Sequence, residues 1–291
     1  MICYVTGFRL TLPACIWDCL EVTEKTTKKP TGKSGESSAK RATAKKPSSS
    51  KSTRKPRKST KKTQPSRWSK IWRWLRWPVR IFGALLAINV LAALFYLVIN
   101  PRMTPYMISE THRLGQLDHA WVRMDEIAPV MARSAVAAED ANFCNHWGFD
   151  TDAIRDALSG GARRGGSTIS QQVVKNVYLW QGRSWLRKGL EAMLTPMVEL
   201  IWSKERILEV YLNVAEFDEG VFGVEAAAVH YFGVNARDLS ARQAARLTTV
   251  LPDPKGRSAS QPGNWQRQRA SSVAGGADLI RADGRADCFA P

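Results

Sequence analysis

The chain has 291 residues and a formal net charge of +17, from 43 Lys and Arg against 26 Asp and Glu. This length allows one catalytic domain of ordinary size and excludes a second enzyme domain. The charge is confined to one stretch, since residues 24–80 hold 20 Lys and Arg against two acids, a local net of +18 that leaves −1 for everything else. The basic character therefore belongs to a tail and not to the domain.

Residues 24–76 have the composition of a basic, disordered tail. They consist mainly of Lys, Ser, Thr, Pro and Gly, with few apolar side chains before Trp68. Such a stretch cannot bury enough apolar surface to offset the entropy of ordering it. Residues 1–23, with three cysteines, resemble neither a signal nor a domain and stay unassigned.

An apolar run after the tail predicts one transmembrane helix over residues 77–100. From Ile81 to Ile99 the only polar side chain is Asn89. Nineteen helical residues extend about 28 Å, which matches the hydrocarbon core of a bilayer. A buried core helix is the alternative, but such helices rarely avoid every charge over this length.

The flanking charges predict the orientation of this helix. Lys and Arg crowd its N-terminal side, whereas Arg102 stands alone after it, so the tail is expected in the cytoplasm and residues 101–291 outside. No small-residue cleavage site follows the run, which predicts an uncleaved single-pass anchor. The tail would then be drawn to anionic lipid. DNA binding by the tail is the alternative, although the Lys-rich stretch has no aromatic platform for bases, and we expect no nucleic-acid partner.

The outer domain is predicted to be mostly helical. From Ile127 to Phe143 apolar residues recur at helical spacing. Glu139 falls in the last turn, where a carboxylate opposes the helix dipole at a cost of about 0.3 kcal/mol or more. A residue kept at an unfavourable position suggests a function. Asp150 or Thr151 is expected to cap a following helix over 152–158.

A glycine-rich loop, Gly160–Gly166, precedes the next helix. Thr168 and Gln171 have the spacing of a capping box, which predicts a helix from Thr168 to about Leu179. Capping does not explain Gln172, Lys175 and Asn176. These amides and the ammonium would form a donor-rich face near a helix N-terminus, which suits an anionic group such as a phosphate.

A second charged cluster lies in "RSWLRKGLEAM". Arg187 and Glu191 are four residues apart on one helix face, with Lys188 beside them. A surface ion pair of little energetic value is an equal alternative on spacing alone. Residues 202–217 predict an amphipathic helix, in which Glu209 is expected to pair with a basic residue, Lys204 or Arg206.

Two carboxylates, Glu139 and Glu191, beside three cations could serve a reaction whose leaving group carries phosphates. One carboxylate would be the general base, and the cations would stabilise the departing charge. The four histidines lack zinc spacing. Spacing does not tell whether Cys144 and Cys288 pair, and we expect Cys144 to be a small buried hydrophobic residue.

Several ordered motifs carry a resemblance to a known family. "EDANFCNHWGFD", "GGSTISQQVVKN", "RKGLE", "SKERILEVYLN", "GVEAAAVHYFG" and "LPDP" are similar, in order and interval, to the motifs of the peptidoglycan glycosyltransferases, glycosyltransferase family 51. One domain and one anchor resemble the monofunctional members. The resemblance implies a lysozyme-like, mostly helical domain in the periplasm, beside the inner membrane. It would polymerise lipid II into β-1,4-linked glycan strands with inversion, releasing undecaprenyl pyrophosphate.

The resemblance also implies residue roles. Glu139 corresponds to the catalytic base, with a pKa raised by burial, and Glu191 to a second essential Glu that helps arrange the pyrophosphate. Asp140, Phe143 and His146 would shape the pocket of Glu139. Positions associated with holding the sugars or pyrophosphate are Ser167, Thr168, Gln171, Gln172, Lys175, Asn176, Arg187 and Lys188. The resemblance implies no required cofactor, and it leaves open a divalent cation, Mg²⁺ or Mn²⁺, near the pyrophosphate. Partners would be lipid II, the lipid-linked strand, the membrane and other cell-wall synthesis or division proteins.

Three rival functions stay open. A lysozyme or lytic hydrolase could share the fold, but it has no need of the three cations. An inactive scaffold would tolerate loss of Glu139. A DNA-tethering membrane protein would depend on residues 24–66, whereas we expect catalysis to survive their deletion.

Overall fold

The computed structural model describes residues 67–159 and 166–289. Helix α1 runs from Arg67 to Val98 and, over Trp74–Val98, is long and apolar enough to cross a membrane, with a mean hydropathy of 2.4. Residues 67–76 are therefore helical, which corrects their assignment to a disordered tail. Residues 1–66, residues 160–165 of the predicted glycine-rich loop, and residues 290–291 lie outside the described residues.

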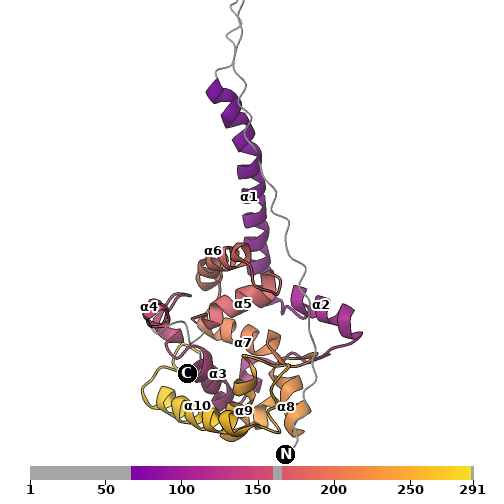
Figure 1. Cartoon of the computed structure of the whole chain (residues 1–291), viewed down its shortest axis with the longest axis vertical. Coiled ribbons are helices and arrows are strands. Elements are labelled where there is room, and N and C mark those ends of the chain that lie inside the picture. Colours follow the sequence, from indigo (N-terminus) through magenta and orange to yellow (C-terminus); the bar gives the residue numbers. More distant parts are fainter. Residues whose placement is uncertain (1–66, 160–165, 290–291) are drawn as a thin grey trace, which may run out of the picture. The chain divides into compact units, whose positions relative to one another are not determined.

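The rest of the described chain is mostly helical, as predicted, with a small sheet (Figure 1). The α-helices after α1 are α2 Pro105–Leu114, α3 Pro129–Glu139, α4 Thr151–Ser159, α5 Ile169–Tyr178, α6 Trp185–Ile201, α7 Lys204–Val214, α8 Val224–Phe232, α9 Ala241–Val250 and α10 Asn264–Ala282. Short 3₁₀ turns are η1 Met124–Glu126, η2 Phe143–Asn145 and η3 Ala236–Asp238. The strands are β1 Asp118–His119, β2 Glu216–Asp218 and β3 Val221–Phe222. Central β3 pairs parallel with β1 and antiparallel with β2.

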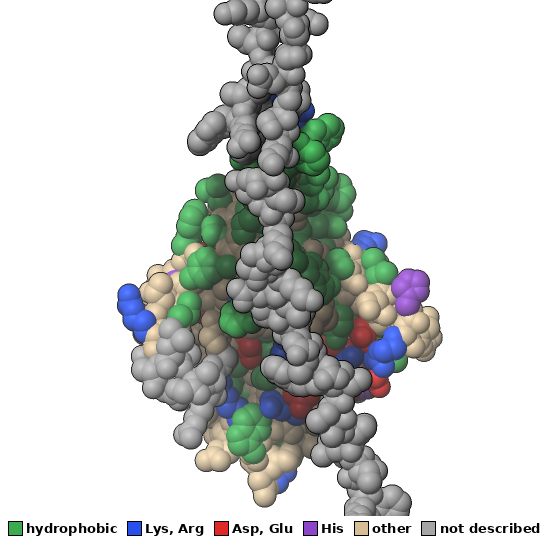
Figure 2. All heavy atoms as spheres, turned by 45° about the horizontal axis from the view of Figure 1, so that its top comes forward, with side chains coloured by type: hydrophobic (Ala, Val, Ile, Leu, Met, Phe, Trp, Pro, Cys, Tyr) green, Lys and Arg blue, Asp and Glu red, His purple; other side chains and the backbone are tan. Residues whose placement is uncertain are grey.

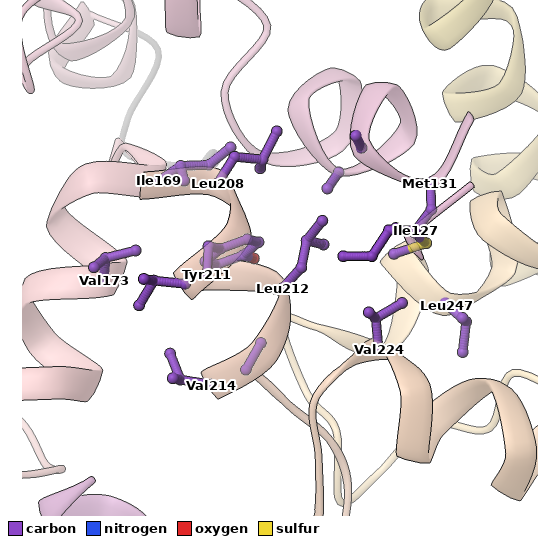
Figure 3. Packing of buried hydrophobic residues seen from close by; sticks show 14 of the residues in the cluster. Ile127, Met131, Ile169, Val173, Leu208, Tyr211, Leu212, Val214, Val224 and Leu247 are labelled. Atoms are coloured by element: carbon purple, nitrogen blue, oxygen red, sulfur yellow. The ribbon is translucent and has the colours of Figure 1, made fainter. Parts of the chain in front are cut away.

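Helix α7 lies at the centre of the core. Its apolar residues occur nearly all round the helix, the pattern of a helix that is buried on every side. Figure 3 shows Leu208, Tyr211 and Leu212 of α7 among side chains of α5 and the segments around α3 and α9, and all three are at most 1% exposed. A rigid centre of this kind fixes the helices that carry the polar residues of the domain.

Local capping accounts for several helix ends. Thr168 and Gln171 form the predicted capping box at the start of α5, and Asp150 Oδ1 accepts the N–H groups of Asp152 and Ala153 at the start of α4. The predicted helix over 202–217 is shorter, because Ser203 caps the start of α7 and Trp202 ends α6.

The predicted helix over 127–143 is also shorter and broken. Helix α3 ends at Glu139, and Asp140 leaves the helical conformation with φ −157° and ψ 72°. Its carboxylate accepts the N–H of Ile169 at 3.0 Å and contacts the His146 ring at 2.8 Å. These tertiary contacts turn the chain toward the start of α5, where helical spacing alone would continue α3.

The C-terminal segment is bound to the turn after α3. Cys144 and Cys288 form a disulfide with their Cα atoms 5.8 Å apart. The expectation that Cys144 is only a small hydrophobic residue was therefore wrong, since sequence spacing carries no information about a contact across 144 residues.

Helix α1 joins the domain at its C-terminal end. Trp202 Nε1 donates to the Ala93 carbonyl at 2.8 Å, and Arg206 Nη2 donates to the Tyr96 carbonyl at 2.8 Å. Arg206 also pairs with Glu209, one of the two partners predicted for that acid. Helices α5 and α6 lie beside this end of α1, while α9 and α10 lie on the far side of α3 (Figure 1).

Candidate active site

Glu139 is the last residue of α3 and lines a cleft of about 700 Å³. Its Oε2 accepts a hydrogen bond from Gln172 Nε2 at 2.9 Å, the one hydrogen bond that the described residues give this carboxylate. Burial raises the pKa of Glu139, while the Gln172 bond and the charges of Arg269 and Lys175 oppose that rise. The direction agrees with the sequence-based expectation and suits a residue that takes up a proton.

Asp140, Phe143 and His146 contact one another and their surroundings after the end of α3. Asp140 also lines the cleft, but its two oxygens already contact the α5 backbone and the His146 ring. Phe143 is fully buried, with Lys204 Nζ 4.4 Å from its ring centroid. Phe143 and His146 thus lie within the turn that follows α3, and of the three residues only Asp140 lines the cleft.

Asp140, His146 and Asp150 have the donor types of a metal site, with ligand atoms within 4.8 Å of one another. Each carboxylate is nevertheless engaged. Asp150 caps α4 with Oδ1 and accepts from Asn142 Nδ2 at 3.0 Å with Oδ2. Hydrogen bonds within the fold therefore account for these two acids.

The start of α5 accounts for three more predicted residues. Thr168 Oγ1 donates to the Gly148 carbonyl at 2.7 Å, and Gln171 Oε1 accepts the Thr168 N–H at 3.0 Å. Ser167 Oγ accepts from Lys188 Nζ at 3.1 Å. Thr168 and Gln171 are thus occupied in shaping the helix start, while Ser167 joins α5 to the cations of α6.

Glu191 is buried on α6 and pairs with Arg187, which is largely buried, and with Lys188, whose side chain is 41% exposed. Glu191 is 2% exposed, Arg187 Nη1 donates to its Oε2 at 2.7 Å, and Lys188 Nζ donates to its Oε1. The alternative of a solvent-exposed surface pair is therefore wrong, because tertiary packing covers this face of α6.

Lys175 points toward the same region from α5. Burial lowers its pKa, Glu191 opposes that effect and Arg187 adds to it. It makes no direct ion pair with a carboxylate of the described residues. Lys175 is therefore the cation of this group most available to an incoming anion.

A divalent cation does not fit beside Glu191. Both of its oxygens already contact cationic groups, whereas Mg²⁺ and Mn²⁺ prefer several oxygen ligands with little competing positive charge. The positive charge of Arg187, Lys188 and Lys175 already supplies what such an ion would add for a phosphate.

A second, smaller pocket of about 190 Å³ lies next to the cleft. Pro252 lines both. Gln172, Lys175 and Asn176 line the smaller one, and Gln181 Nε2 donates to Asn176 Oδ1 at 3.2 Å. Because Gln172 also bonds Glu139, the carboxylate lies where the two hollows meet, with the cleft on one side and Lys175 on the other.

Sequence reasoning missed one wall of the larger cleft. That wall comes from the loop before α10 and from α10 itself, and consists of Arg257, Trp265 and Arg269. The Arg257 guanidinium lies 4.7 Å from the Trp265 ring centroid. The four-residue spacing of Trp265 and Arg269 was the available signal, but it did not show which part of the fold they face.

Apolar side chains are exposed on α6 and the segment before it. The exposed residues are Trp180, Trp185, Leu186, Met193 and Leu200. Figure 2 shows hydrophobic side chains gathered on the upper part of this view and charged ones below. Apolar surface of this extent beside a membrane-length helix is typical of a lipid contact.

Comparison with known proteins gives a consistent result. A family model described as transglycosylase matches residues 107–276. The chain is 60% identical over 218 residues to a biosynthetic peptidoglycan transglycosylase of Jannaschia sp. (strain CCS1), covering 75% of this chain and 90% of that protein. It is 46% identical over 214 residues to the Caulobacter vibrioides protein of the same name, covering 72% and 93%. A Pseudomonas fluorescens (strain SBW25) protein of that name is 47% identical over 209 residues, covering 66% and 87%.

Proposed function

The chain belongs to the transglycosylase family, and from this premise we propose how its residues build glycan strands. Its activity is that of a peptidoglycan glycosyltransferase in cell-wall synthesis. The observation that carries the proposed mechanism is the position of Glu139, a carboxylate with a raised pKa at the meeting point of two hollows.

Glu139 acts as the general base. It takes the proton from the 4-hydroxyl of the acceptor, lipid II, as that oxygen attacks the anomeric carbon of the donor, the lipid-linked strand. The bond from this carbon to the pyrophosphate breaks, and the lipid pyrophosphate leaves with the electron pair. The α-linked donor thus becomes a β-1,4 glycoside, without a covalent enzyme intermediate. The hydrogen bond from Gln172 fixes the carboxylate for this step.

The departing pyrophosphate lies against Lys175, Arg187 and Lys188. These cations stabilise the charge that develops on the leaving group, and Glu191 keeps two of them in place. They belong to α5 and α6, next to the end of α1, where a lipid-linked group would reside. The proposed steps are not routed through a metal ion, because both oxygens of Glu191 are already paired with cations.

The membrane arrangement follows from α1. Residues 24–66 lie in the cytoplasm, α1 spans the inner membrane once, and the catalytic domain lies in the periplasm. The disulfide supports this orientation, because disulfides persist in oxidising compartments. The exposed apolar residues of α6 would touch the bilayer surface, which brings the cations to lipid II. Other cell-wall synthesis proteins are expected partners.

A polymerisation assay tests the mechanism. Purified full-length protein in detergent is given labelled lipid II, and products are separated on a gel with and without a muramidase. We expect muramidase-sensitive polymer from the wild type and none from Glu139→Gln. Glu205→Gln, the same change on an exposed Glu of α7, is the matched control and should keep full activity.

Three results would contradict the mechanism. Polymer made by Glu139→Gln would show that this residue is not the base. Absence of polymer from every variant, while another transglycosylase makes it under the same conditions, would favour the scaffold reading. Shortened sugar fragments in place of polymer would favour the hydrolase.

A further inference from the structure

The C-terminal segment, residues 264–289, holds the turn after α3 at three points. Arg269 Nη2 donates to the Ala138 carbonyl at 3.1 Å, and Arg285 Nη1 donates to the Ala141 carbonyl at 2.9 Å. The Cys144–Cys288 disulfide is the third point. Glu139 lies between the first two contacts, and α10 runs beside α3 (Figure 1).

Arg269 lines the cleft that holds Glu139, whereas Arg285 does not. The last carbonyls of a helix lack partners within the helix, and a cation there also interacts favourably with the helix dipole. Arg269 supplies such a contact one residue before Glu139 and lines the same cleft as its carboxylate. Arg285 contacts Ala141 and Asp283 and is not part of that cleft.

We infer that Arg269 is a positioning residue for Glu139, because its guanidinium fixes the end of α3 that presents the carboxylate and keeps a positive charge beside it. The inference rests on the proposed role of Glu139 as the base. It assigns the C-terminal helix a part in the reaction as well as in the packing of the domain.

Several charged or titratable groups surround Glu139, from α5, α7, α10 and the flanking turns. They are Asp140, Lys175, Tyr211, Arg257 and Arg269. Burial raises the pKa of Glu139 most, Asp140 adds to the rise, and Arg269 and Lys175 lower it. Without Arg269, burial would raise this pKa further, and less of the base would be ionised at a given acidic pH.

The test is the pH dependence of kcat/KM for lipid II polymerisation by the full-length protein in detergent. Removing the charge in Arg269→Gln should move the acid limb upward by about half a pH unit. This is less than the 1–3 units of a close buried pair, because Arg269 is exposed. Arg269→Lys, which keeps the charge, should leave the limb near its wild-type position. Arg285→Gln loosens the same segment and should not move the limb.

The salt dependence of the acid limb gives a second test, in which the wild type is compared with Arg269→Gln. Because Arg269 is exposed, raising the ionic strength should screen its charge and move the wild-type limb upward. The Arg269→Gln limb should respond less. The difference between the two proteins isolates Arg269, because Lys175 and Asp140 also act on Glu139 and are present in both.

Two outcomes would overturn the inference. Equal melting temperatures and unmoved limbs in Arg269→Gln and Arg285→Gln would make Arg269 only a structural contact. A higher KM with an unmoved limb would make it a substrate-binding residue. Failure of the proposed function is distinguishable, since it appears as polymer made by Glu139→Gln, whereas failure of this inference leaves Glu139→Gln inactive.

Discussion

The two carboxylates of the site differ in what surrounds them. Glu139 accepts one hydrogen bond from a neutral amide and opens onto a cleft. Glu191 is almost fully buried, and each of its oxygens faces a cation. A carboxylate with free lone pairs can take up a proton, whereas one held by two cations serves to hold those cations.

The two carboxylates also lie in different parts of the domain. The Glu191 group lies on the helices next to α1, and the Glu139 wall is completed by α10 on the other side. In the proposed mechanism, charge for the leaving group comes from the helices next to α1, and the base for the nucleophile comes from the side that α10 completes. Variants of Glu191 and Lys175 change the cationic part of the site, whereas variants of Cys288 and Glu139 change the part next to the C-terminal segment.

The largest effect is expected from Glu191→Gln. It leaves the buried Arg187 and its neighbour Lys188 without a carboxylate, and loss of one partner of a buried pair costs roughly 3–5 kcal/mol. Thermal melting in detergent should show a large fall, with loss of polymerisation. A variant as stable as Glu205→Gln would mean that the pair contributes little.

Loss of the disulfide should be next. Cys288→Ser frees the C-terminal segment from the turn after α3 and should lower the free energy of unfolding by about 2–4 kcal/mol. A reductant should lower the melting temperature of the wild type by a similar amount and leave the variant unchanged. Equal responses of both proteins to reductant would contradict this role.

Lys175→Gln tests the leaving-group side without breaking an ion pair. We expect kcat to fall roughly 100-fold, the size of effect seen when one stabilising group is lost from a transition state. The melting temperature should not fall, because burial of the ammonium is unfavourable. Lys175→Arg keeps the charge and serves as the control; a lower melting temperature with unchanged kcat would argue for a structural lysine.

The smallest effect concerns the stability of Glu139→Gln. Burial raises the folded-state pKa of Glu139 above its unfolded value. The contribution of Glu139 to the free energy of unfolding is therefore fully present below the unfolded pKa and is lost as pH rises through the folded pKa. The neutral variant should therefore match the wild type at about pH 4 and melt roughly 2 °C higher at about pH 8. A variant that is less stable at the higher pH would show that the ionised carboxylate is well solvated.

Part of the site could be predicted because it depends on neighbours in sequence. The position of Glu139 in a last helical turn and the Thr168–Gln171 capping box were correct, since both are set within one or two turns of helix. The motifs also led to the family that the comparisons show. The break after Glu139 was missed because it goes with a long-range hydrogen bond, which the Ile169 N–H donates to the Asp140 carboxylate.

By itself the sequence determined the membrane-length helix, the mostly helical class and several helix starts, and it singled out the two acids whose roles are proposed above. These follow from periodicity, apolar length and capping, which act between residues close along the chain. Tertiary structure alone decided that Glu191 is buried, that Gln172 holds Glu139, that Cys144 joins Cys288 and that Arg269 faces the cleft. The partners in the last three contacts come from separate segments, and only the packing of α10, α5 and α3 against the core brings them together.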